Sequence, residues 1–140
     1  MYETMTVFID EIKTHDIGEV IIDKEHKGTM DSPIRMPWIR YSETVMKLTK
    51  AIYQFVDEHQ DYDLRHYDAI LEKQGIQWSM EAMRKADVSI LDGITIMALL
   101  VGVIRAERFC DGILLDFFQD GTITSWLKRL KEIDETNANE

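Results

Sequence analysis

Residues 94–104 read Ile94-Thr-Ile-Met-Ala-Leu-Leu-Val-Gly-Val-Ile104, and this apolar stretch decides the fold. It is too short to cross a bilayer, which needs about 20 apolar residues. Because it is apolar on nearly every side, it predicts a helix buried at the centre of the protein. Ser89-Ile-Leu-Asp92 matches a capping box ahead of the stretch, and Arg105-Ala-Glu-Arg108 ends it with charge. We therefore predict a central helix over about 90–109.

Helical periodicity also recurs on both sides of the central helix. Each further segment carries apolar residues three or four apart, which is typical of an amphipathic helix. Most of these segments also begin beside a residue that suits a helix start. They are residues 3–14 and the segments that follow Ser42, Asp63, Ser79, Gly112 and either Thr122 or Thr124. The sequence thus predicts a mainly α protein, with five or six helices around the central one.

A small β element is predicted near the N-terminus, which makes the expected class α+β with helix dominant. Residues 19–23 contain a β-branched run, and residues 34–41 are extended in character because Pro33 and Pro37 exclude helix. The two segments predict a β-hairpin or a pair of edge strands. Since Pro37 has no N–H to donate, the second strand should have a free edge or a bulge there.

The same extended segment is the predicted contact between two copies of the chain. It carries a large aromatic residue between two aliphatic ones, at a strand edge that is expected to be free. An edge of this kind can pair with another chain. The predicted interface residues are Met36, Trp38 and Ile39. The alternative is that Trp38 packs against the helices of its own chain.

Length and composition fit one domain over residues 1–140, with residues 136–140 expected to form a frayed tail. The net charge of −10 is unevenly spread. Residues 1–31 hold 8 acids and 3 bases, residues 32–110 hold 11 and 10, and residues 111–140 hold 7 and 3. An acidic surface repels nucleic-acid phosphate and anionic lipid, so we expect neither a nucleic acid nor a membrane as a partner.

The sequence contains no pattern of a known catalytic, metal or cofactor site. P-loop, dinucleotide, GxSxG and HExxH motifs are missing. The acidic stretch 57–68 lacks the glycine that a calcium loop needs, because Tyr62 or His66 stands at that position. We expect no catalytic residue, no metal and no cofactor, and we favour a non-enzymatic protein. The lone Cys110 excludes an intramolecular disulfide, so a cytoplasmic location is expected.

The charged end of the central helix is the one candidate ligand site. It holds Arg105, Glu107, Arg108 and Asp111. Arg105 and Arg108 are three residues apart and share a helix face, so together they could bind a carboxylate or a phosphate. The structural alternative is that both arginines satisfy the last carbonyls of the helix and pair with Glu107, Asp111 or other acids.

The same region carries a family resemblance. Its most specific part is an Arg-x-x-Arg-Phe-x-x-Gly signature, here Arg105, Arg108, Phe109 and Gly112. Further matching segments are Asp23–Gly28, Pro33–Pro37 with Tyr41, Gly121–Ile123 and Trp126–Leu130. Together they resemble a family of small uncharacterised bacterial proteins that is catalogued as a domain of unknown function. The resemblance implies a bacterial, intracellular, single-domain protein and implies no mechanism.

Three hypotheses about function remain open at this point. The leading one is a non-enzymatic cytoplasmic protein that acts through protein–protein contact or self-association. The second is an acidic inhibitor or nucleic-acid mimic that occupies the groove of a basic partner, which the charge of −10 suggests. The third is a protein or enzyme that binds a small anionic ligand through Arg105 and Arg108.

Overall fold

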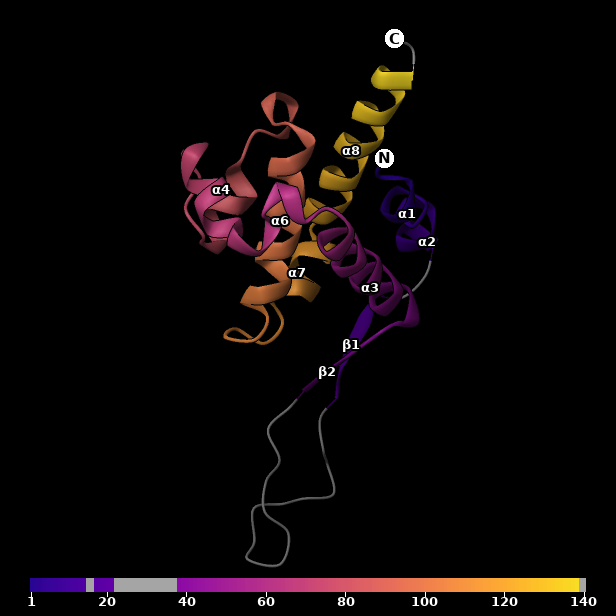
Figure 1. Cartoon of the computed structure of the whole chain (residues 1–140). Coiled ribbons are helices and arrows are strands. Elements are labelled where there is room, and N and C mark those ends of the chain that lie inside the picture. The colour runs from indigo at the N-terminus through magenta and orange to yellow at the C-terminus, as the bar shows by residue number, and fades with distance from the viewer. Residues whose placement is uncertain (15–16, 22–37, 139–140) are drawn as a thin grey trace, which may run out of the picture.

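The computed structural model describes residues 1–14, 17–21 and 38–138. Within them the chain is mainly helical, with one small antiparallel β pair (Figure 1). The helices are α1 (Glu3–Thr6), α2 (Ile9–Thr14), α3 (Glu43–Glu58), α4 (Tyr67–Lys73), α5 (Met80–Lys85), α6 (Gly93–Ala106), α7 (Ile113–Gln119) and α8 (Thr122–Ala138). The strands are β1 (Gly18–Ile21) and β2 (Trp38–Tyr41), and short 3-10 turns cover Gln60–Tyr62 (η1), Leu64–His66 (η2) and Val88–Ile90 (η3).

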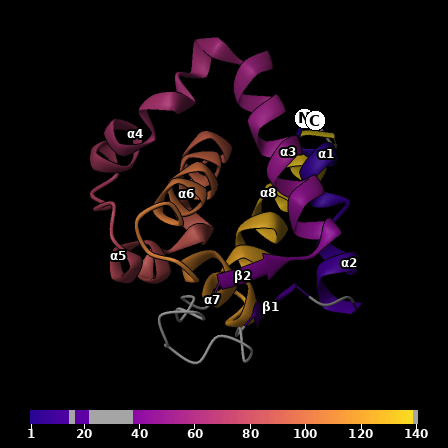
Figure 2. The ribbon, with the colours of Figure 1, turned by 90° about the horizontal axis from the view of Figure 1, so that it is seen from below.

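Helix α6 lies at the centre, as the apolar stretch predicts. Residues Ile96–Leu99 are completely buried, and the helix contacts α3, α4, α7 and α8. Figure 2 shows α6 with the other helices arranged around it. Thr95 is buried too, and it is the one buried polar residue of the described chain. The predicted class, mainly α with a small N-terminal hairpin, is confirmed.

The limits of the central helix differ from the predicted 90–109. Asp92 is the residue that caps α6, since its carboxylate accepts a hydrogen bond of 2.8 Å from the Thr95 amide. Val88–Ile90 before it form the 3-10 turn η3, and Asp87 caps this turn by accepting from the Ser89 amide. The predicted capping box therefore starts too early. At the other end the helix stops at Ala106, and a turn follows it.

The N-terminal hairpin joins the helical body beside α3. β1 pairs with β2 in antiparallel register, with Gly18 opposite Tyr41 and Ile21 opposite Trp38. Ser42 then caps α3, since its hydroxyl accepts from the Val45 amide at 3.4 Å. The predicted free edge or bulge at Pro37 lies outside the described residues.

The two ends of the described chain pack together. The predicted helix over 3–14 is divided into α1 and α2, and both lie along α8 (Figure 1). The Tyr2 amide donates a hydrogen bond of 2.8 Å to the Asp134 carboxylate of α8. Helix α8 continues to Ala138, so it includes residues that the sequence assigned to a frayed tail. Among the described residues, the helices are too short or too polar to cross a lipid bilayer.

Candidate functional site

The Glu107 carboxylate connects three segments at the end of α6. Its Oε1 atom accepts hydrogen bonds from the Tyr41 hydroxyl at 2.6 Å and from the Gly112 amide at 2.9 Å. Its Oε2 atom accepts from the Leu114 amide at 2.9 Å. The carboxylate thus satisfies amides that the first turn of α7 leaves without helical partners. We conclude that Glu107 holds α6, α7 and β2 together.

The Tyr41 hydroxyl completes this network. It donates to Glu107 and also accepts a hydrogen bond of 3.2 Å from the Leu115 amide. Burial and the hydrogen bond to the Glu107 carboxylate raise the pKa of the Tyr41 phenol. The phenol therefore remains a neutral donor over the whole physiological range.

Arg105 has a different environment from Glu107. Its Nε atom is buried, and no hydrogen-bond partner for it exists among the described residues. Its guanidinium carbon lies 5.8 Å from the centre of the Tyr53 ring, a cation–π contact. In the part of the chain that is described, no carboxylate forms an ion pair with Arg105 or Arg108. The described residues therefore do not show these arginines paired with Glu107 or Asp111.

Tyr67 of α4 lies close to both arginines. Burial raises the pKa of the Tyr67 phenol, while the charges of Arg105 and Arg108 act in the opposite direction. Because Tyr53 and Tyr67 belong to α3 and α4, the end of α6 is flanked by a phenol on each of two neighbouring helices.

A groove runs between α3 and the end of α6. It has a volume of about 540 Å³ and a mainly apolar lining. The helical side chains along it are Val45, Met46, Thr49, Lys50 and Tyr53 from α3, Ile104 from α6 and Leu114 from α7, with Tyr41 and Glu107 completing it. Sequence reasoning did not identify this groove. The sequence does contain a signal for the groove. Residues 46, 49, 50 and 53 are three or four apart, so they form a second stripe on α3 beside the buried stripe.

A second apolar surface lies on the other side of α6. Phe109 is 82% exposed, and Trp78 and Met80 beside it are exposed as well. Between them is a hollow of about 220 Å³, whose lining includes the buried Met83 and Ile113. We call the three exposed side chains and this hollow the Phe109 patch. The sequence did not predict it, although a phenylalanine directly after four residues rich in charge is a visible signal.

Aromatic contacts fix the shape of the Phe109 patch. The Trp78 ring packs edge-on against Phe109 at 6.3 Å and against Tyr67 at 5.4 Å, measured between ring centres. The Trp78 indole N–H donates a hydrogen bond of 2.9 Å to the Gly102 carbonyl of α6. Cys110 and Asp111 are exposed at the same turn. The patch is therefore built on a fixed indole, and Phe109 extends from it into solvent.

The structure places only part of the predicted interface. Met36 lies outside the described residues, and only the backbone of Trp38 is described. Ile39 is partly buried, and its Cδ1 atom lies 3.0 Å from where a Cβ on Gly112 would stand. Gly112 has a φ of +96°, so a side chain there would be strained, and its Cβ would also press on Ile39.

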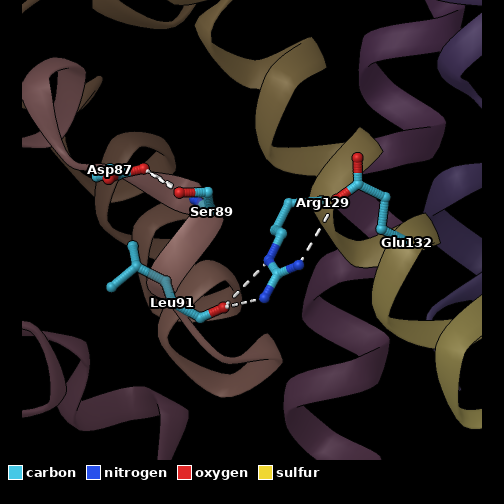
Figure 3. Close-up of polar contacts among 5 residues, drawn as sticks. All are labelled: Asp87, Ser89, Leu91, Arg129 and Glu132. Atoms are coloured by element: carbon cyan, nitrogen blue, oxygen red, sulfur yellow. Dashed lines mark hydrogen bonds and ion pairs between the residues drawn. The ribbon is translucent and has the colours of Figure 1, made fainter.

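Hydrogen bonds from α8 attach the segment before α6 to the rest of the protein. Arg129 reaches from α8 to the Leu91 carbonyl, with both Nε and Nη2 at 3.3 Å, as Figure 3 shows. The same guanidinium pairs with Glu132 at 3.5 Å, and Asp87 accepts from Ser89 nearby (Figure 3). No group of three or more candidate metal ligands occurs among the described residues.

Comparison with known proteins gives one match. No curated protein and no solved structure matches the chain. The family model described as Family of unknown function (DUF6508) matches residues 2–136. This confirms the resemblance that the motifs indicated, and it adds no activity to it. The chain, from its first helix to the last turns of α8, belongs to this family of unknown function.

Proposed function

We propose that the protein acts through protein–protein contact, by self-association through the Phe109 patch. The observation that carries the proposal is the 82% exposure of Phe109 beside an apolar hollow. Exposed aromatic side chains that surround a hollow mark interaction surfaces, and aromatic anchors contribute much of the binding energy there. A projecting ring next to a hollow can fit its own copy across a two-fold axis.

The distribution of charge supports association at this surface. The acidic excess belongs to the two ends of the chain, while residues 32–110 hold 11 acids and 10 bases. Trp78, Met80 and Phe109 all come from this nearly neutral part. Two copies that meet here therefore bring less like charge together than the net charge of −10 suggests. A cytoplasmic setting suits such a protein, since its one cysteine is a free thiol.

Analytical ultracentrifugation across the micromolar range tests the proposal. We expect the wild-type protein to dimerise with concentration and Phe109→Ser to weaken dimerisation by at least tenfold, as for an interface anchor. Ile90→Ser is the matched control, because Ile90 is 78% exposed at the other end of α6 and should not affect assembly. A protein that stays monomeric at every concentration contradicts the proposal, as does an equal effect of both variants.

Cys110 offers a second readout in the same experiment. Its exposed thiol lines the hollow of the Phe109 patch. We expect a bulky maleimide on Cys110 to block dimerisation, and we expect dimerisation to slow the labelling reaction. Equal labelling rates in dilute and concentrated protein would show that the interface lies elsewhere.

A further inference from the structure

The Phe109 patch has one charge of each sign at its border. Arg108 directly precedes Phe109, and Asp111 follows it two residues later. All three side chains are exposed. Within the described residues, neither Arg108 nor Asp111 forms an ion pair. The described part of one copy of the chain thus leaves two opposite charges without a counter-ion beside its most exposed aromatic ring.

The two charges lie toward different elements. Burial raises the pKa of the Tyr67 phenol of α4, and the charge of Arg108 counteracts this rise. Burial also raises the pKa of the Tyr41 phenol of β2, and the charge of Asp111 adds to this rise. Helix α4 and strand β2 lie well apart in both views of the molecule (Figures 1 and 2). Because Coulomb effects weaken with distance, Arg108 belongs to the α4 side of the turn and Asp111 to the β2 side.

A two-fold contact at this turn makes the two charges complementary. In such a contact every pair of residues forms twice, once in each direction. An axis that runs between Arg108 and Asp111 places each arginine opposite the aspartate of the other copy. An axis that runs through either residue places like charges together, which is unfavourable. The charges therefore favour one axis over the others.

The size of the hollow also suits a second copy. Its volume of about 220 Å³ is below the range of about 300–1,000 Å³ that is typical of pockets for small molecules. It is thus better suited to a single side chain than to a free ligand. The exposed Phe109 of another copy supplies an aromatic side chain of this kind, and a charged border around it would exclude water from the contact.

We propose that the Phe109 patch recognises a second copy of this chain, in which Arg108 of each copy pairs with Asp111 of the other. This inference rests on the self-association proposed above and adds its axis and its selectivity. The two ion pairs bring no net charge into the contact of a chain with charge −10. Pairs at an exposed border act mainly on orientation and on the choice of partner, whereas reversing one charge creates two contacts between like charges.

Charge reversal tests the pairing by analytical ultracentrifugation at low ionic strength, where exposed pairs are screened least. Arg108→Asp and Asp111→Arg should each weaken dimerisation by at least about tenfold, because each creates like-charge contacts twice. The double variant Arg108→Asp/Asp111→Arg restores opposite charges and should dimerise within about threefold of the wild type. A mixture of the two single variants should form a heterodimer, although neither variant dimerises well alone.

Lys131→Asp and Glu135→Arg are the matched controls, because both residues are exposed on α8 and the net charge changes by the same amount. Each should change dimerisation by less than about twofold. If the wild type dimerises but the double variant and the mixture stay as weak as the single variants, the pairing is wrong and self-association through Phe109 still stands. Equal losses in the controls would also overturn the pairing. A wild type that stays monomeric overturns both proposals.

Discussion

The two ends of α6 differ in how their charged groups are used. At the start, Asp92 caps the helix and Arg129 donates to the Leu91 carbonyl, so each charge has a protein partner. At the end, the Glu107 carboxylate is used by α7 and β2, and Arg105 is left with a buried Nε without a partner among the described residues. The first end is built for stability. The second combines a stabilising acid with Arg105, which forms no ion pair among the described residues.

The groove and the Phe109 patch both lie near the end of α6 at which Glu107 is used. Once Glu107 bonds to Tyr41, Gly112 and Leu114, it is not available to neutralise Arg105. The turn after α6 also carries Phe109 into solvent. Both the groove and the Phe109 patch thus border the joint between α6 and α7.

The largest expected effect comes from removing the acid that organises this end. Glu107→Ala leaves the Gly112 and Leu114 amides and the Tyr41 hydroxyl without their acceptor. Because hydrogen bonds to charged groups contribute about 1.5–3 kcal/mol, we expect the free energy of unfolding to fall by about 3 kcal/mol. Urea denaturation measures it. The control is Asp111→Ala on the same turn, which should stay within about 0.5 kcal/mol. Similar losses for both variants would contradict the role given to Glu107.

A smaller loss of stability is expected from a change at the start of α6, where the packing is tight. A Cβ on Gly93 would overlap the Tyr2 hydroxyl and lie 2.5 Å from the Tyr2 Cζ atom. The Tyr2 ring is buried and stacks on Phe55 at 5.4 Å, so it has little room to move. Overpacking of this kind costs about 1–3 kcal/mol of stability. We expect Gly93→Ala to lower the free energy of unfolding, measured by urea denaturation, by about 2 kcal/mol.

Tyr2→Phe checks the cause of that loss. Gly93→Ala should cost less when the hydroxyl is missing, so the two changes should not be additive in a double-mutant cycle. Additive losses would show that the alanine acts on something other than the Tyr2 ring.

The smallest effect, and the most direct comparison of the two ends, comes from replacing each arginine by methionine. Arg129→Met should lose about 1 kcal/mol, because its bonds to the Leu91 carbonyl disappear. Arg105→Met should change stability by less than about 0.5 kcal/mol. The substitution removes a buried Nε that has no partner among the described residues, and this gain offsets the lost cation–π contact with Tyr53. A larger loss for Arg105→Met than for Arg129→Met would reverse the comparison.

The sequence predicts the architecture well, because local pattern determines it. A continuous apolar run specifies the buried α6, and Ser42 with the stripe from Val45 to Val56 specifies α3. The predicted start of α6 is too early because Ser89 and Asp92 both suit a helix N-cap, and only packing decides between them. The division of residues 3–14 into α1 and α2 likewise has no strong local signal.

The candidate site was only partly predictable. The sequence singles out Arg105, Glu107, Arg108 and Asp111, but their partners lie far away in the chain. Tyr41 is 66 residues from Glu107, and Tyr53 belongs to another helix than Arg105. No local pattern tells whether an acid pairs with the neighbouring arginine or with a distant phenol. Ligand binding by these residues stays a prediction, and so does the acidic-inhibitor hypothesis.

The hydrogen-bond network at Glu107 also has a consequence for the evolution of the family. Tyr41 supplies a hydroxyl, Glu107 a carboxylate, and Gly112 an amide in a conformation with φ of +96° that other residues rarely adopt. The Tyr41 hydroxyl and the Gly112 amide both donate to the same Glu107 oxygen, so both depend on this acid. A lineage that loses Glu107 has less reason to retain the other two, so the three positions should be inherited together. Members of the family that lack the tyrosine should then carry a different joint between their two helices.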